Sequence, residues 1–322
     1  MNKLIKIYRS LPRHNNNHPS AVTIGNFDGV HIGHQQLIKK VVQTSNKYNL
    51  VPTVLSFNPH PKAYFAMKSK TSNQAPRQIS SLRDKIQALT KYGIRQVVLL
   101  PFNHHLAHMP ANIFVQQLLV SGLNTKELFV GRDFKFGHKR EGDIQLLEKL
   151  STSMSFGLNV TDDIISSDGL RVSSSYIRTS LSSGNIELAN SMLGRPYQLS
   201  GHVLHGRKLG RTIGVPTLNI KAPEKCALRL GVYTVMVYGL NNSPIPGVAS
   251  IGVRPTVEKQ GNMLLEVHLL NTNVQAYGKL VCVEFLSFIR EELKFPNLTT
   301  MKAAIEQDMR QANDYFVTHG LQ

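Results

Sequence analysis

Three glycines and two histidines near the start of the chain form the segment whose residue types are best suited to chemistry. Apolar residues 21–24 predict a short buried strand, and a helix is predicted over residues 34–44. Between them runs Gly25-Asn26-Phe27-Asp28-Gly29-Val30-His31-Ile32-Gly33-His34. Glycines let the backbone approach a phosphate closely, and a helix N-terminus offers free N–H groups and the positive end of its dipole. The spacing favours nucleotide binding over a structural or metal-binding histidine pair.

A second segment that can do chemistry lies beyond the middle of the chain. Thr217 and Asn219 stand two apart in an extended segment, so their side chains face the same side. Their oxygens suit Mg²⁺, a hard cation that proteins commonly share with nucleotide phosphates. Taken alone, Pro-Thr-x-Asn is a weak turn signal. The residues around it strengthen its interpretation as a phosphate site: Gly206, Arg207, Gly210, Arg211 and Gly214.

Three histidines close together, His104, His105 and His108, raise the question of a zinc site. Zinc takes four ligands in structural sites, and no Cys, Asp or Glu neighbours this group. The pattern therefore favours a surface loop. The cysteines, Cys226 and Cys282, lack the C-x-x-C spacing of a zinc site, and we expect both to be reduced and buried.

Charge is the compositional feature that stands out. Among 322 residues, 37 are Lys or Arg and 20 are Asp or Glu, which gives a net charge of +17. Such an excess attracts nucleic acid, anionic lipid or phosphorylated small molecules. The basic residues are scattered, and no apolar run approaches the ~18 residues of a membrane span. We therefore expect a cytoplasmic protein that binds neither nucleic acid nor membranes.

The nucleotide segment needs a rigid frame, and the first half of the chain predicts one. Strands are predicted over 21–24, 51–57, 96–100 and 127–130, and helices over 34–44, 82–89 and 113–120. Strand–helix alternation of this kind predicts a parallel sheet covered on both faces. Ligands of such sheets bind at the carboxyl ends of the strands.

The pattern changes near residue 185. Short segments rich in β-branched and aromatic residues follow, over 231–238, 247–251, 264–270 and 280–288, and they predict an antiparallel β-barrel. An apolar stripe over 301–316 predicts one closing helix. We expect two domains, an α/β domain over residues 1–184 and a β-rich domain over residues 185–322.

The first segment resembles a known family. His31-Ile32-Gly33-His34 is similar to the signature of the nucleotidyltransferase superfamily, whose later phosphate-binding segment, S-S-T-x-I-R, resembles residues 173–178. Hydroxyls and a guanidinium suit phosphate oxygens, and Ser175 keeps the hydroxyl of the usual Thr. The resemblance implies a Rossmann-like fold in which His31, His34 and Arg178 are catalytic. It also implies ATP contacts at Gly25, Phe27, Asp28, Gly29 and Ser174.

The second half resembles riboflavin kinases. Residues 206–219 are similar to a kinase motif that ends in P-T-A-N, with Leu218 in place of Ala. The resemblance implies Mg²⁺ ligands at Thr217 and Asn219 and a catalytic base at Glu266. Pattern alone describes Glu266 as an exposed strand position with a cross-strand partner. The ATP contacts implied in this half are Gly206, Arg207, Gly210 and Gly214.

Matching segments extend over nearly the whole chain, which thus resembles the bacterial bifunctional riboflavin kinase/FMN adenylyltransferases. Residues 57–61, 131–137 and 290–295 are similar to the flavin and nucleotide segments of that family. The flavin-binding residues that this implies are Asn58, His60, Pro61, Asp133 and Arg290.

The resemblance implies two ATP-dependent steps, riboflavin to FMN and then FMN to FAD and pyrophosphate. The phosphate of FMN is already anionic, so adenylyl transfer needs charge stabilisation rather than a general base. Phosphorylation of riboflavin must deprotonate a ribityl hydroxyl, for which a carboxylate such as Glu266 is suited.

Two other functions fit parts of the sequence. A nucleotidyltransferase that acts on another phosphorylated acceptor would share the first half, but it would not require the β-rich half. A nucleic-acid binder would use the +17 charge, but it predicts clustered basic residues with exposed aromatics, whereas Trp is absent and aromatics make up 7%.

Overall fold

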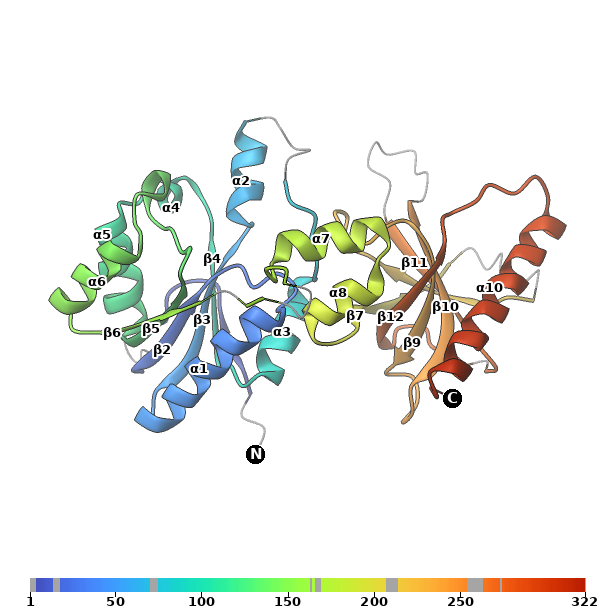
Figure 1. Cartoon of the computed structure of the whole chain (residues 1–322), viewed down its shortest axis with the longest axis horizontal. Helices are drawn as coiled ribbons and strands as arrows, with labels where there is room; N and C mark the ends of the chain where they lie inside the picture. Colours follow the sequence, from blue (N-terminus) through green and yellow to red (C-terminus); the bar gives the residue numbers. More distant parts are fainter. Residues whose placement is uncertain are drawn as a thin grey trace. The chain divides into compact units, whose positions relative to one another are not determined.

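The computed structural model describes residues 4–13, 18–69, 75–162, 164–165, 169–206, 214–253, 263–272 and 274–321. The chain forms two compact units (Figure 1). The first unit comprises Met1–Pro76 and Lys85–Ser173, and the second comprises Arg77–Asp84 and Ser174–Gln322. Arg207 and Gly210, two of the predicted ATP contacts, lie outside the described residues.

The first unit is built on a six-stranded parallel sheet, as predicted. The strand order reverses between β2 and β5, and a ligand crevice forms at the carboxyl ends of strands at such a point. In sheet order the strands are β1 (Lys6–Tyr8), β4 (Gln96–Pro101), β3 (Val51–Asn58), β2 (Ser20–Ile24), β5 (Thr125–Gly131) and β6 (Gly157–Thr161).

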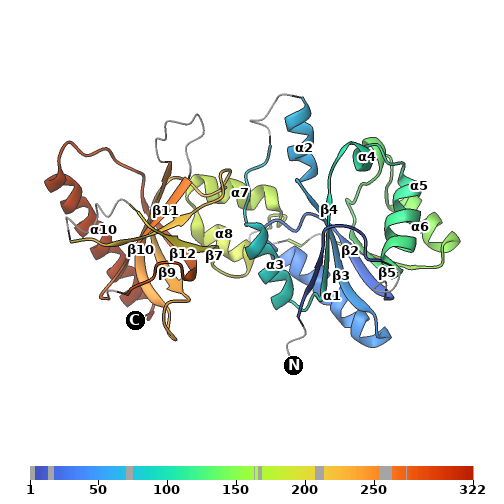
Figure 2. The ribbon, with the colours of Figure 1, turned by 180° about the vertical axis from the view of Figure 1, so that it is seen from behind.

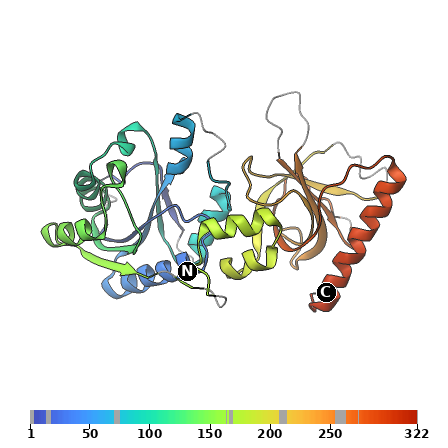
Figure 3. The ribbon, with the colours of Figure 1, turned by 45° about the horizontal axis from the view of Figure 1, so that its top comes forward.

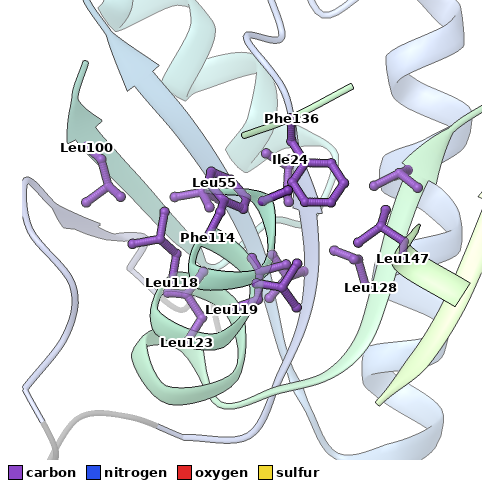
Figure 4. Close-up of a cluster of buried hydrophobic side chains, with 14 of the residues drawn as sticks. Ile24, Leu55, Leu100, Phe114, Leu118, Leu119, Leu123, Leu128, Phe136 and Leu147 are labelled. Carbon is purple, nitrogen blue, oxygen red and sulfur yellow. The ribbon is translucent and has the colours of Figure 1, made fainter. Parts of the chain in front are cut away.

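Side chains alternate between two cores on opposite faces of this sheet, because successive residues of a strand point to opposite faces. In β2, Ala21 belongs to one core and Val22 to the other, and Phe129 and Leu128 of β5 divide in the same way. Helices α1 (Ile32–Tyr48) and α3 (Leu82–Lys91) contribute to the first core. Figure 4 shows the second core, in which Leu55, Phe114, Leu118, Leu128 and Leu147 converge.

The helix predicted over 113–120 has a different form. It begins as α5 (Ala111–Ile113) and continues as the π-helical segment η3 (Phe114–Ser121). The wider π turn brings Phe114, Val115, Leu118 and Leu119 onto one buried face. The remaining helices of this unit are α2 (Pro61–Lys68), α4 (His104–Ala107), η4 (His138–Arg140) and α6 (Ile144–Ser153).

The histidines of 104–108 are exposed, as expected of a surface segment, but they lie on a short helix rather than in a loop. Asn103 caps α4 by accepting a hydrogen bond from the Leu106 N–H at 3.0 Å. The rings of His104 and His108 stack with centroids 4.0 Å apart, an i, i+4 contact that a loop would not impose.

The second unit is a closed antiparallel barrel, as predicted. Leu265, Val267 and Leu269 of β11 are buried, while the residues between them are only partly buried, so the strand has an inner and an outer side. In barrel order the strands are β10 (Ile245–Val253), β11 (Met263–Leu269), β8 (Thr217–Lys221), β7 (Tyr197–Leu204), β12 (Leu280–Arg290) and β9 (Gly231–Tyr238).

The predicted closing helix is α10 (Leu298–Thr318), which lies beside the barrel (Figure 2). Ala312 and Phe316 of α10 form a buried cluster with Val232, Met236 and Val248 of β9 and β10. No helix in the described ranges has both the length and the apolar character that a membrane crossing requires.

Two helices that precede the barrel strands pack within the second unit, α7 (Ser174–Ser183) and α8 (Ile186–Leu193), as Figure 3 shows. Asn190 of α8 donates a hydrogen bond to the Phe285 carbonyl at 3.0 Å. Residues 77–84 join the same unit, since the backbone of Gln78 pairs with that of residues 225–227. Along the chain, the last division between the units falls at Ser173/Ser174, eleven residues before the expected boundary between residues 184 and 185.

One ion pair ties α10 to the barrel. The guanidinium of Arg290, in the last position of β12, donates to both carboxylate oxygens of Asp308 at 2.7 and 2.6 Å. The Asp308 side chain is 4% exposed and that of Arg290 is 23% exposed. A bidentate pair with one buried partner is costly to break, because the surviving charge lacks solvation.

We predict that Asp308→Asn destabilises the second unit. Removing one member of a buried ion pair costs about 3–5 kcal/mol, and we expect the lower end because Arg290 keeps some contact with solvent. Urea unfolding followed by circular dichroism measures this loss. Asp314→Asn, an exposed position on the same helix, is the matched control. A loss no larger than that of the control would contradict the stabilising role of the pair.

Candidate active sites

The two histidines of the first predicted site come together at the N-terminus of α1. His31 is the N-cap residue, and its side chain does not cap the helix, so the first N–H groups remain available to a ligand. The rings of His31 and His34 stack with centroids 3.7 Å apart, and the Phe27 ring lies 4.9 Å from that of His34. A helix N-terminus with two imidazoles beside it is suited to attract an anion.

Burial sets the protonation of His34. It lowers the pKa of His34 well below 6.5, and the nearby charges of His31 and Lys85 lower it further. His34 is therefore neutral at pH 7. Its Nδ1 is buried and makes no hydrogen bond to any described residue. A neutral imidazole with a vacant nitrogen is suited to exchange hydrogen bonds with a bound phosphate.

The loop between β2 and α1 has a strained backbone. Phe27, Gly29 and Val30 have φ values of 47°, 82° and 44°, in the left-handed region. That region is unfavourable for a β-branched residue such as Val30, which is fully buried. Gln35 holds it by donating to the Val30 carbonyl at 2.8 Å. Strain of this kind persists where the surroundings impose it, and it concentrates at functional sites.

A pocket of about 480 Å³ opens at the carboxyl ends of β2, β3 and β5. Three of the predicted flavin-binding residues line it, namely His60, Pro61 and Asp133, whereas Asn58 is the last residue of β3 and does not. Gly25 and Asn26, which begin the loop to His31, line the same pocket. The predicted nucleotide loop and three of the four flavin residues predicted in this unit thus share one site.

Aromatic residues that the sequence analysis missed dominate the wall of this pocket. Phe57 and Phe65 each contact Phe102 edge to face, with centroids 5.8 Å apart. Phe65 is 52% exposed, which is unusual for a phenylalanine. An apolar wall with an exposed ring suits a planar aromatic ligand. The signal in the sequence was the aromatic content of residues 57–65, but the contact with Phe102 depends on the fold.

In the second unit, strand register brings the predicted kinase residues together. Asn219 of β8 and Glu266 of β11 are direct cross-strand partners, as are Thr217 and His268. Partners in an antiparallel pair point to the same face, so Thr217, Asn219 and Glu266 share the outer side of the barrel. Asn219 is 7% exposed. A Cβ at Gly206 would collide with the Asn219 amide, which explains a glycine there.

The oxygens on this face fit a magnesium ion. A hydroxyl, an amide oxygen and a carboxylate are the hard donors that Mg²⁺ takes, and it completes its shell with water and phosphate. Within the described part of the chain no three His, Cys, Asp or Glu side chains cluster for metal binding. A cation here would therefore depend on the nucleotide for its remaining ligands.

A cavity of about 420 Å³ lies next to Thr217. Its lining combines apolar and polar groups, including Pro216, Leu218, Gln275 and Tyr277. Gly214, a predicted ATP contact, has a φ of 79° and lies close in sequence to this lining. The cavity has the size and mixed polarity of a small-ligand site.

Glu292 is a carboxylate near Glu266 that the site prediction did not include. Burial raises the pKa of Glu292, and the charge of Glu266 raises it further. A Cβ at Gly252 would collide with the Glu292 carboxylate, so this glycine makes room for it. A neighbouring negative charge disfavours the ionised form of a carboxyl group.

Two predicted site residues have protein partners within the second unit. Arg178 donates from Nε to the Arg77 carbonyl at 2.7 Å. Arg290 pairs with Asp308, so its guanidinium already has a structural partner. Ser174 is the first residue of α7. Roles of these residues in binding phosphate or flavin remain predictions.

Comparison with known proteins identifies two family regions in the chain. The family model for FAD synthetase matches residues 13–176, and that for riboflavin kinase matches residues 193–316. The bifunctional riboflavin kinase/FMN adenylyltransferase of Haemophilus influenzae is 42% identical over 298 residues, covering 92% of this chain and 94% of that protein. The protein of the same name from Escherichia coli strain K12 is 40% identical over 297 residues, 92% of each chain.

A solved structure matches both units. The crystal structure of a protein described as a macrolide-efflux protein, from Streptococcus pneumoniae, superposes with a TM-score of 0.80 at 25% identity. The match covers 96% of this chain and 99% of that one. From the two family models and the full-length relatives, the chain belongs to the bifunctional riboflavin kinase/FMN adenylyltransferases, which make FMN from riboflavin and FAD from FMN.

Proposed function

We propose that each unit carries out one of the two steps. FMN is adenylylated in the first unit, where Gly25 and Asn26 line the pocket and begin the loop that leads to the N-terminus of α1. Riboflavin is phosphorylated in the second, on the face that holds Thr217, Asn219 and Glu266. The observation that supports this proposal is that His31, His34 and the aromatic pocket lie in the first unit, whereas Thr217, Asn219 and Glu266 lie together in the second.

Adenylyl transfer in the first unit depends on charge stabilisation. The free N–H groups at the start of α1 attract the phosphates of ATP, and the helix dipole adds to this attraction. His31 and His34 offer hydrogen bonds to the phosphate that is attacked. His34 is neutral before the nucleotide arrives, and the added negative charge favours its protonation. The aromatic wall around Phe102 holds the flavin ring of FMN.

Phosphorylation in the second unit depends on a base. The Glu266 carboxylate accepts the proton of the ribityl hydroxyl as that oxygen attacks the γ-phosphate of ATP; the bond from the γ-phosphorus to the bridging oxygen breaks and ADP leaves. Thr217 and Asn219 would hold Mg²⁺ through their side-chain oxygens, and the bound ion would offset the charge of the nucleotide phosphates. The cavity beside Thr217 holds the rest of the nucleotide.

We predict that the first unit works without the barrel. A shortened chain of residues 1–184 should convert FMN to FAD and should leave riboflavin unphosphorylated, because its sheet has its own two cores. Chromatography of the flavins measures both activities. Residues 77–84 lose their partners at 225–227 in this chain, so its thermal unfolding is measured in parallel. A folded but inactive shortened chain would refute the independence of this unit.

We predict that Asn219→Leu abolishes riboflavin phosphorylation. Leucine has a similar volume but lacks the amide oxygen that would bind Mg²⁺. The measurement is FMN formation across a Mg²⁺ titration. Asn313→Leu, an exposed position on α10, is the control for an added leucine. Kinase activity that stays at the wild-type level when Mg²⁺ is limiting would remove Asn219 from the site.

We predict that single substitutions separate the two activities. Glu266→Gln keeps the shape of the side chain but cannot accept a proton, so FMN formation should fall about 10²–10⁴-fold. FAD formation from supplied FMN should be nearly unchanged. His31→Ala should slow FAD formation by about 10²–10³-fold, and riboflavin should then accumulate as FMN.

The assay supplies riboflavin, ATP and Mg²⁺, and chromatography separates the three flavins. Circular dichroism shows that each variant is folded. Equal loss of both steps in either folded variant would mean that the two reactions share one active site. Absence of FMN and FAD with folded wild-type protein would refute the two-site proposal as a whole.

A further inference from the structure

A short loop of the first unit, residues 136–142, forms part of the pocket wall. The backbones of Phe136 and Gly142 bond to each other in both directions, at 3.1 and 2.9 Å, which closes the loop at its base. Glu141 accepts a hydrogen bond from the Ala111 N–H at 2.8 Å. His138 donates its N–H to the Met109 carbonyl at 2.8 Å. The loop is therefore held at its base and on its flank.

The tip of this loop has an unusual backbone. Gly137, Lys139 and Arg140 have φ values of 75°, 48° and 63°, so two long side chains adopt the left-handed region in succession. A Cβ at Gly137 would collide with Ala111, so the loop packs too closely there for any other residue. Each left-handed residue other than glycine costs free energy. The fixed base and flank hold Lys139 and Arg140 in place despite that cost.

Lys139 and Arg140 line the pocket without a carboxylate partner among the described residues. Other charged residues of the lining are neutralised: Lys135 pairs with Asp143 at 3.2 Å, and Asp133 pairs with Arg171 at 2.6 Å. The nearest carboxylate in sequence, Glu141, bonds to the Ala111 N–H. Together with Lys62, the loop tip gives the lining an excess of positive charge.

We propose that Lys139 and Arg140 determine specificity by binding the phosphate of FMN, so that this site rejects unphosphorylated flavin. The inference rests on the proposed function, in which this pocket holds FMN. A phosphate monoester carries close to two negative charges at neutral pH, whereas the flavin ring and the ribityl chain are neutral. The two substrates of the protein share their ring system, so the aromatic wall alone cannot distinguish them.

Of the three cations, the two on the loop are the better discriminators. Lys62 lies in the first turn of α2 and offers a single ammonium group. Lys139 and Arg140 are neighbours that both line the pocket, so they can bind one phosphate together. The guanidinium of Arg140 can also bind two phosphate oxygens at once.

Initial rates of FAD formation test the proposal in the full chain. The KM for FMN is measured, together with the inhibition constant of lumiflavin, which has the flavin ring without a ribityl chain and cannot be phosphorylated. For Lys139→Gln combined with Arg140→Gln, the KM for FMN should rise about tenfold or more. The inhibition constant of lumiflavin and kcat should stay within about twofold. Added salt should raise the wild-type KM more than that of the variant.

A second variant separates loss of charge from damage to the loop. Glycine adopts positive φ without strain, so Lys139→Gly with Arg140→Gly should keep or raise the melting temperature and still lose selectivity for FMN. Lys149→Gln, an exposed position on α6 outside the pocket lining, controls for the change in net charge. Equal increases in the KM for FMN and in the inhibition constant of lumiflavin would overturn the proposal. An unchanged KM for FMN would overturn it as well.

Phe102→Leu tests the proposed function independently. If the pocket holds the flavin ring, this substitution should raise the KM for FMN and the inhibition constant of lumiflavin to a similar extent. If neither constant changes in Phe102→Leu, flavin binds elsewhere. Both the proposed flavin site and the proposed role of Lys139 and Arg140 would then be wrong. Weaker binding of both flavins in the Phe102 variant, together with loop variants that keep the wild-type KM for FMN, would overturn only the role of Lys139 and Arg140.

Discussion

The uncapped N-terminus of α1 is the constraint on which the first unit depends. The chain must leave β2, reverse, and start a helix whose first N–H groups are not capped by the side chain of the N-cap residue. It does so through left-handed residues at 27, 29 and 30, a strained path that burial of Phe27 and Val30 stabilises. Phe27 and Val30 both pack in the core to which α1 contributes, so this path depends on that face of the sheet being covered.

The barrel must also hold polar groups in fixed positions on a rigid frame. It does so through strand register rather than through a strained backbone. Asn219 and Glu266 share a face because they are cross-strand partners, and a slip of one residue would turn one of them into the barrel interior. Closure removes free strand edges that would allow such a slip. The buried pair of Arg290 and Asp308 then holds α10 against the outer side of the strands.

Much of this could be predicted from local patterns. Strand–helix alternation indicated the parallel sheet, and the separation of Thr217 and Asn219 by two residues indicated their common face. What could not be predicted depends on contacts distant in sequence. The partner of Asp308 is 18 residues away, and Arg178 bonds to a carbonyl 101 residues away. The left-handed backbone at Lys139 and Arg140 follows from the closure of residues 136–142, which no propensity of Lys or Arg indicates.

The net charge of +17 shows why composition alone selects no ligand. Lys135 and Arg171 add to the total, yet each is paired with a nearby carboxylate and adds little net attraction for an anion. Lys139 and Arg140 count equally in composition, but they have no such partner among the residues that the structure describes, and they line a pocket with an aromatic wall. His34 adds nothing to the total at neutral pH. The ligand is therefore selected by which cations remain unpaired beside apolar surface, a property of the fold.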